Sequence, residues 1–203
     1  DDLATVRIDA RLDAAVHGLE EILAVVMDVK AEQVIAQQTV EQSLVEVLRV
    51  HAGLSRHDGR NRVPELLARV GLRDQVGRAL PARLSGGEKQ RVAIALALAV
   101  EPRLLILDES VSALDVSVQA QVINLLTDLR AELGLTYLFI THDLGVVRQV
   151  SDECLVMRRG AVVEAGPTDE VLSTPRNDYT RELMAAVPGP GWVPSRRSGR
   201  EVA

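Results

Sequence analysis

Short aliphatic segments that alternate with helical patterns constrain the fold of this chain more than any other feature. Residues 104–107 are wholly aliphatic, and Thr136–Ile140 is a second apolar segment of strand length. Between them, Val116–Leu133 has the apolar spacing of a helix, and Gly134 follows it as an end signal. Strands without polar alternation are typical of a parallel sheet that is buried on both faces. The sequence therefore predicts an α/β fold with a mainly parallel sheet, in which ligands bind beyond the carboxyl ends of the strands.

The rest of the chain predicts further helices and one hairpin. Two apolar runs at residues 154–157 and 161–164 flank Arg159-Gly160, which indicates an antiparallel hairpin. Residues 55–59 are polar and predict a turn, and Gly71 stands where a helix is expected to end. Alternation predicts a short strand at residues 5–9, and helical spacing predicts helices over residues 14–28, 40–51, 62–70, 88–100, 144–150, 168–173 and 179–187.

Composition excludes several classes of protein. The chain carries 29 acidic and 23 basic side chains, a net charge of −6, which argues against a broad nucleic-acid-binding surface. Its single cysteine, Cys154, excludes an internal disulfide and a cysteine-based metal cluster within this chain. No segment of the sequence approaches the roughly 18 to 20 apolar residues that span a bilayer. We therefore expect a protein that works in a reducing cytosol and contacts membranes only through partner proteins.

Two adjacent carboxylates, Asp108 and Glu109, follow the aliphatic segment at residues 104–107 directly. Adjacent acids at the edge of a sheet are unfavourable unless a cation or a polar group compensates them. A hydrated magnesium ion on nucleotide phosphates would suit Asp108, and Glu109 could then orient a water molecule and accept its proton. A pair of solvated acids at the start of a loop is the alternative that this dipeptide leaves open.

Ser85, Gly86 and Gly87 open directly onto a helical pattern. Unpaired N–H groups and the positive end of the helix dipole favour an anion there, and glycine lets a phosphate approach the backbone. A tight turn is the alternative, with Ser85 as the N-cap and Glu88 completing a capping box. The two interpretations are compatible.

His142 follows the apolar segment Thr136–Ile140, within the sequence Thr141-His-Asp143. At the carboxyl end of a strand, a histidine can donate a hydrogen bond to a phosphate oxygen or hold a water molecule. An ordinary loop histidine is the alternative, and Asp143 can equally be the N-cap of the next helix.

Four of these segments occur together in one order: Leu84-Ser-Gly-Gly-Glu-Lys-Gln-Arg91, residues 104–109, Ser112-Ala-Leu-Asp115 and Thr141-His-Asp143. In this order and spacing the chain closely resembles ABC-type ATPases, with their signature motif, Walker B strand, D-loop and H-loop. The resemblance implies a P-loop NTPase-like core with an incomplete N-terminal portion and a helical subdomain at about residues 40–100. It also implies ATP and Mg²⁺ as cofactors, with the nucleotide held between two subunits.

The resemblance assigns roles to individual residues. Glu109 and His142 are the expected catalytic residues, with Glu109 polarising water and His142 bracing the γ-phosphate. Asp108 is the expected magnesium ligand. Contacts to the nucleotide are expected from the signature motif and the D-loop, at Ser85, Gly86, Gly87, Glu88 and Asp115.

Residues 34–37 resemble the Q-loop of the same family, and residues 39–51 resemble the helix that follows it. This implies that Gln37 contacts magnesium and water and senses the membrane partner. The aspartate–proline stretch that the family carries just after this glutamine is absent here. A solvated helix residue is the alternative for Gln37.

The C-terminal third is similar to that of oligopeptide/dipeptide importer ATPases at residues 159–167, 174–180 and 183–188. Departures from that pattern are Glu88 for the usual Gln, Ser110 for the usual Pro, and Asn177-Asp178 for the usual His-Pro. The resemblance implies an ABC ATPase domain over residues 1–174 and an importer-like tail over residues 175–203. It further implies transmembrane permease subunits and a second ABC ATPase subunit as partners, on the cytoplasmic face of the cell membrane.

The phosphate-binding pattern G-x-x-x-x-G-K-[ST] occurs nowhere in the sequence. The simplest interpretation is a chain that begins after this loop, and a variant that lost the loop is the rival. We expect an ATPase that drives import of peptides or similar solutes in the intact parent. For this chain alone we expect weak or absent nucleotide binding and negligible hydrolysis. The alternatives are a truncated or degenerate subunit that completes a partner's ATP site, and a non-transport ABC ATPase.

Overall fold

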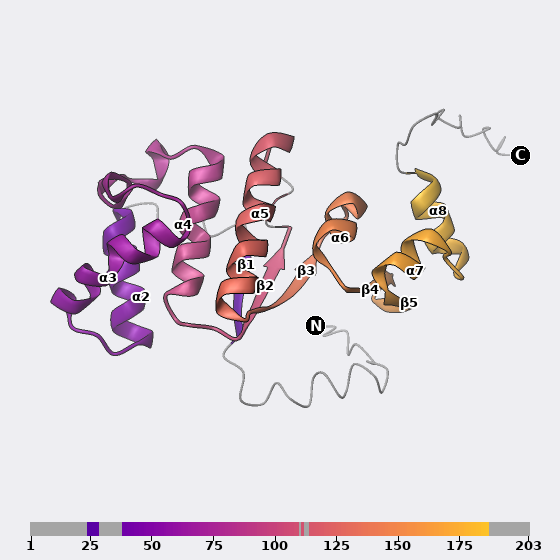
Figure 1. Cartoon of the computed structure of the whole chain (residues 1–203), viewed down its shortest axis with the longest axis horizontal. Helices are drawn as coiled ribbons and strands as arrows, with labels where there is room; N and C mark the ends of the chain where they lie inside the picture. Colours follow the sequence, from indigo (N-terminus) through magenta and orange to yellow (C-terminus); the bar gives the residue numbers. More distant parts are fainter. Residues whose placement is uncertain (1–23, 29–37, 110, 112–113, 187–203) are drawn as a thin grey trace, which may run out of the picture. The chain divides into compact units, whose positions relative to one another are not determined.

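The aliphatic strand that follows Pro102 is the centre of a three-stranded parallel sheet (Figure 1). The computed structural model describes residues 24–28, 38–109, 111 and 114–186. These residues form two units, with the boundary between Val146 and Val147.

The sheet of the first unit contains β1 (Ala24–Asp28), β2 (Leu104–Asp108) and β3 (Thr136–Ile140), in the order β1-β2-β3. All neighbours are parallel, so their carboxyl ends lie at one edge. Leu105 and Leu107 of β2 are fully buried, and such burial contributes about 1.5 to 3 kcal/mol per side chain. The predicted α/β architecture with a mainly parallel sheet is confirmed.

The predicted helix over residues 14–28 is wrong at its C-terminal end. Residues 24–28 form β1, which pairs with β2 along its whole length. The apolar residues of this segment fit either period, and pairing with the buried strand β2 decides in favour of the strand. The remainder of that prediction, and the predicted strand at residues 5–9, lie outside the described residues.

β3 was predicted as a buried strand, and this is also wrong. Its residues alternate between exposed and half-buried, with Leu138 and Ile140 45% and 48% exposed. β3 occupies the end of the strand order in the described part of the sheet and pairs with β2 alone there. An apolar sequence therefore marked a strand correctly but did not reveal how much of it is covered.

Helices α2 (Val40–His51) and α3 (Arg56–Arg69) pack against each other and against α4 (Gly86–Leu98). α2 has the predicted bounds and begins with a capping box. α3 starts earlier than predicted, because the Ser55 hydroxyl accepts a hydrogen bond from Asp58 N at 3.1 Å and turns the expected loop into the first helical turn. Gly71, with φ +69°, ends α3 as predicted. Two short 3₁₀ helices, Asp74–Arg78 and Pro81–Arg83, lead to α4.

α5 (Val116–Leu133) and α6 (Leu144–Val150) have the predicted bounds. α5 buries one stripe of side chains, and Gly134 ends it in the left-handed conformation at φ +65°. The stripe consists of Val122, Ile123, Leu126 and Leu129. None of the described helices is long and apolar enough to cross a membrane.

The second unit contains the predicted antiparallel hairpin, β4 (Glu153–Arg158) and β5 (Ala161–Pro167). Arg159 and Gly160 form its turn with φ +50° and +79°, a pair of angles typical of a tight hairpin turn. Helix α7 (Thr168–Ser173) packs on the hairpin, and α8 (Asp178–Ala186) follows it.

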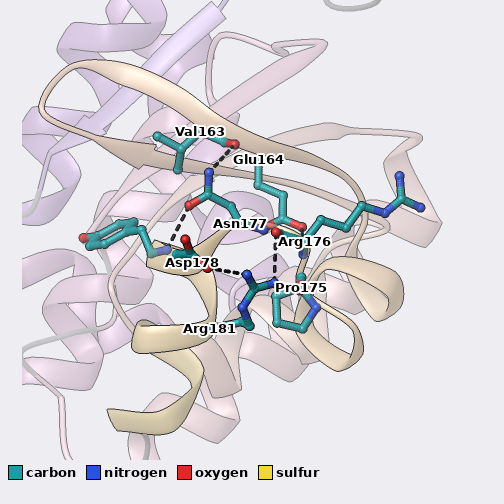
Figure 2. A network of polar contacts seen from close by, with 8 residues as sticks. Val163, Glu164, Pro175, Arg176, Asn177, Asp178 and Arg181 are labelled. Carbon is teal, nitrogen blue, oxygen red and sulfur yellow. Dashed lines mark hydrogen bonds and ion pairs between the residues drawn. The ribbon is translucent and has the colours of Figure 1, made fainter.

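Glu164 of β5 holds the segment that joins α7 to α8 (Figure 2). Its carboxylate accepts hydrogen bonds from Arg176 N at 2.7 Å and Asn177 N at 3.2 Å. Asn177 in turn donates to Val163 O at 3.2 Å. The hydroxyl of the buried Thr180 lies beside Glu164 without forming a hydrogen bond of standard geometry. This hydroxyl and the two N–H groups hold the pKa of Glu164 below its usual value.

We predict that the stability of the second unit depends on the charge of Glu164. A lowered folded-state pKa means that the stabilisation is present above the unfolded value of about 4.3 and is lost as pH falls through the folded value. Urea unfolding of the hairpin, followed by NMR between pH 6 and 3, is expected to show this loss in the unaltered chain and a flatter profile in Glu164→Gln. Glu182→Gln, which removes an exposed carboxylate on α8, is the control and should keep the original profile. Equal profiles for all three proteins would contradict the account.

Candidate functional site

The carboxyl edge of the sheet carries the two predicted acids. Asp108 is the last residue of β2 and stands in register with Asp28 of β1 and Ile140 of β3. Glu109 follows it with φ +45°, and its N–H donates to Ile140 O at 2.9 Å. A residue other than glycine at positive φ is strained by about 1 to 3 kcal/mol, and such strain clusters at functional sites. The backbone thus turns out of the sheet at Glu109.

The structure brings Glu109 and His142 together across 33 residues of sequence. His142 Nδ1 lies 3.1 Å from Glu109 Oε1. The contact is a hydrogen bond when a neutral ring carries its proton on Nδ1, and an ion pair when the ring is protonated. Both side chains remain accessible, with exposed fractions of 75% for His142 and 57% for Glu109. A carboxylate and an imidazole that touch and also face solvent can exchange protons with a bound substrate or water.

Asp143 fixes the loop that carries His142. Its Oδ1 accepts hydrogen bonds from Gly145 N at 2.9 Å and Val146 N at 3.2 Å, which caps α6 as the sequence allowed. Its Oδ2 accepts a hydrogen bond from Gln119 Nε2 at 3.1 Å. The Gln119 contact above all, with the two N–H groups, holds the pKa of Asp143 below its usual value.

Gln119 was not singled out from the sequence as a site residue. It lies within Val116–Leu133, for which the sequence predicted a helix and no functional role. The sequence signal that could have found it is a long polar side chain one turn into an apolar helix. In the structure this residue is only half-exposed.

Ser85 and Glu88 form the capping box at the start of α4. The Ser85 hydroxyl accepts a hydrogen bond from Glu88 N at 3.3 Å, and Glu88 Oε2 accepts from Ser85 N at 2.9 Å. The Ser85 N–H and hydroxyl together hold the pKa of Glu88 below its usual value. The alternative left open by the sequence is therefore confirmed, and it leaves the N–H groups of Gly86 and Gly87 outside the capping box.

Gly86 and Gly87 also permit a close approach between helices. A Cβ on Gly87 would lie 2.6 Å from Val118 Cγ1, and one on Gly86 would lie 3.4 Å from Leu114 Cδ2. Both neighbours flank Asp115, the N-cap of α5, whose carboxylate accepts from Val118 N at 3.0 Å. The Val118 N–H and the Ser117 hydroxyl hold the pKa of Asp115 below its usual value. The starts of α4 and α5, which carry the predicted nucleotide contacts, are thus packed side by side.

Of the two predicted metal ligands, Asp108 and Gln37, the structure describes only Asp108. Gln37 lies outside the described residues, so its position remains a prediction. No group of three or more His, Cys, Asp or Glu side chains that could hold a metal occurs in the described parts of the chain. Magnesium in nucleotide sites needs only one or two carboxylates besides phosphate and water, and Asp108 at the strand end suits that donor set.

The family model described as ABC transporter matches residues 11–112, half of the chain. The chain belongs to the ABC transporter family. This confirms the resemblance drawn from the signature motif, the Walker B strand, the D-loop and the H-loop.

Curated proteins that are similar to this chain are named as ATP-binding proteins of import and transport systems. It is 50% identical over 167 residues to the glutathione import ATP-binding protein GsiA of Salmonella typhimurium, covering 82% of this chain and 26% of that protein. It is 48% identical over 152 residues to the peptidoglycan transport ATP-binding protein YejF of Agrobacterium fabrum, covering 74% of this chain and 28% of that protein. The chain therefore spans about a quarter of the length of these relatives.

Solved ABC proteins share the fold. One is cbiO1 from Clostridium perfringens, part of the ABC transporter complex cbiONQ, with a TM-score of 0.63 and 32% identity over 74% of this chain and 59% of that one. Another is MJ1267, an ATP-binding cassette of an ABC transporter, with a TM-score of 0.65 over 82% of this chain and 68% of that one. At 20% identity, the second likeness concerns the fold alone.

We predict that Gly87→Ala destabilises the first unit through the contact with Val118. A Cβ at 2.6 Å must displace Val118, and overpacking of this kind costs about 1 to 3 kcal/mol. Gly86→Ala is the matched control, because its 3.4 Å contact needs only a small adjustment while alanine favours the helix. Thermal unfolding should show a lower midpoint for Gly87→Ala alone, restored when Val118→Ala is added. Equal midpoints for the two glycine variants would refute this packing.

Proposed function

We propose that this chain is part of the ATP-binding subunit of an ABC importer for glutathione, peptides or similar small solutes, and that Glu109 and His142 are its catalytic residues. The observation that carries the proposal is the 3.1 Å contact between these two side chains at the carboxyl edge of the sheet. Ligands of parallel α/β sheets bind beyond that edge. The similarity to glutathione and peptidoglycan transport proteins supports the class of solute.

In this proposal Glu109 acts as the general base of ATP hydrolysis. Its carboxylate takes a proton from a water molecule, and the water oxygen bonds to the γ-phosphorus while the bond to the β-phosphate oxygen breaks, giving ADP and phosphate. His142 contacts the Glu109 carboxylate through Nδ1, which orients the base. The positive φ of Glu109 directs the backbone out of the sheet, so the side chain remains accessible.

Asp108, with Gln37, is proposed to hold the magnesium ion. Asp108 ends a buried strand and adjoins the proposed base. This position fits a single carboxylate contact to magnesium, either direct or through a water molecule. Magnesium supplies charge neutralisation for the phosphates when it is bound.

The starts of α4 and α5 are proposed to face a nucleotide that a second ABC subunit binds. Gly86 and Gly87 provide first-turn N–H groups that the capping box of Ser85 and Glu88 does not use, at the positive end of a helix dipole. Asp115 caps α5 through Val118 N, and Val118 packs against Gly87, so Asp115 is proposed to contact the same nucleotide.

The remaining parts of the proposal concern the whole protein. We propose an ABC ATPase domain over residues 1–174, with a helical subdomain at about residues 40–100, and an importer-type tail over residues 175–203. The partners would be transmembrane permease subunits and a second ABC subunit. The protein would then lie peripherally on the cytoplasmic face of the cell membrane.

The proposal predicts that Glu109→Gln abolishes turnover but keeps ATP bound. The test uses this chain joined to a segment that carries the pattern G-x-x-x-x-G-K-[ST], so that a phosphate-binding loop is supplied. Loss of a general base lowers the rate by about 10²- to 10⁴-fold, and phosphate release measures it. Glu132→Gln removes an exposed carboxylate near the far end of α5 and is expected to leave the rate unchanged. Undiminished release from Glu109→Gln would reassign the base.

A further inference from the structure

Gln119 connects α5 to the loop that carries His142. Its Nε2 donates to Asp143 Oδ2 at 3.1 Å, a half-buried contact between residues 24 apart in the sequence. The hydrogen bond goes to an ionised acceptor at neutral pH, since the pKa of Asp143 lies below its usual value, and bonds to charged acceptors are about twice as strong as neutral ones.

On the loop side, Asp143 is held from several directions. Its N–H donates to Thr141 Oγ1 at 3.0 Å, and its Oδ1 caps α6 through Gly145 N and Val146 N. These contacts shape the loop and the start of α6, but all of them lie within residues 141–146. Of the contacts that Asp143 makes, the one from Gln119 relates this loop to another helix.

On the helix side, Gln119 belongs to the turn of α5 that packs against α4. Its N–H donates to Asp115 O at 2.8 Å, and Val118, its neighbour, meets Gly87. The first turn of α5 therefore touches the glycine-rich start of α4 on one side and, through Gln119, the His142 loop on the other.

We propose that Gln119 is a positioning residue that holds His142 against Glu109 by tying the loop at residues 141–143 to the first turn of α5. This inference rests on the proposed function, because it concerns the same pair of side chains. It adds that the start of α4 and the His142 loop are mechanically linked within one chain. A shift of the first turn of α5 then reaches His142 through one side-chain hydrogen bond.

The test measures the motion of the His142 ring by carbon-13 relaxation in the 203-residue chain, without nucleotide. Gln119→Leu keeps the size of the side chain and removes the donor. The order parameter of the ring is expected to fall, because the loop that carries it loses its tie to α5. His51 and His57, on other helices, serve as internal references. Gln121→Leu, the same substitution at an exposed position two residues along α5, should leave all three rings unchanged.

Exchanging the donor and the acceptor of the Gln119–Asp143 hydrogen bond distinguishes positioning of His142 from a general loss of packing around Gln119. Gln119→Glu alone places two carboxylates together and should mobilise His142, whereas adding Asp143→Asn restores a hydrogen bond of opposite polarity. Asparagine caps helices as well as aspartate does, so the start of α6 is retained. Recovery of the ordered ring in the double variant supports the proposal. An unchanged ring in Gln119→Leu, or no recovery in the double variant, overturns it.

The outcome is independent of whether the chain hydrolyses ATP, so failure of the proposed function leaves this result interpretable. In the protein joined to the phosphate-binding segment, Gln119→Leu should lower kcat about ten- to a hundredfold, since misplacement of a catalytic group has effects of this size. The KM for ATP should not change, because Gln119 is not among the proposed nucleotide contacts. A raised KM with an unchanged kcat would contradict a positioning role.

Discussion

The parallel pairing of β2 with a strand on each side is the interaction on which the rest of the site depends. Because the register aligns Asp108 with Ile140, the chain leaves β2 and β3 at the same level of the sheet. Glu109 continues this alignment with a backbone hydrogen bond to Ile140 O, and His142 follows two residues after it. A slip of one residue would move the acid away from the imidazole and place Leu105 and Leu107 on the opposite face of the sheet. Core burial and site geometry are therefore enforced by the same pairing.

A second constraint is the closeness of α4 and α5 at their starts. The glycines of the signature segment suit a phosphate-binding helix start, and the structure adds a packing reason, because Val118 occupies the space that a Cβ on Gly87 would need. Ser85 caps α4 and Asp115 caps α5. The side chain of each accepts a hydrogen bond from a backbone N–H group in the first turn of its helix. The two helix starts, where the helix dipoles have their positive ends, thus lie side by side.

Much of this arrangement was predictable, for physical reasons that differ between elements. α5 and the β4–β5 hairpin were found with correct types because apolar period and turn residues agree there. The placement of Glu109 and His142 at one edge of the sheet followed from the rule that parallel strands end at one edge, whereas their direct contact did not. β1 was missed because a five-residue apolar strand has no period of its own, and its identity comes from β2. The exposure of β3 and the hydrogen bond from Gln119 to Asp143 depend on neighbours far along the chain. A local sequence pattern does not encode such neighbours.

The contact between Glu109 and His142 is the central claim, and nitrogen-15 NMR of the imidazole rings tests it most directly. Removing the acceptor with Glu109→Ala should shift the Nδ1 resonance of His142 and leave those of His51 and His57 in place. Glu132→Ala should shift none of them. A His142 resonance that is the same with and without the Glu109 carboxylate would show that the two side chains are not in contact, and the proposed site would fall with that result.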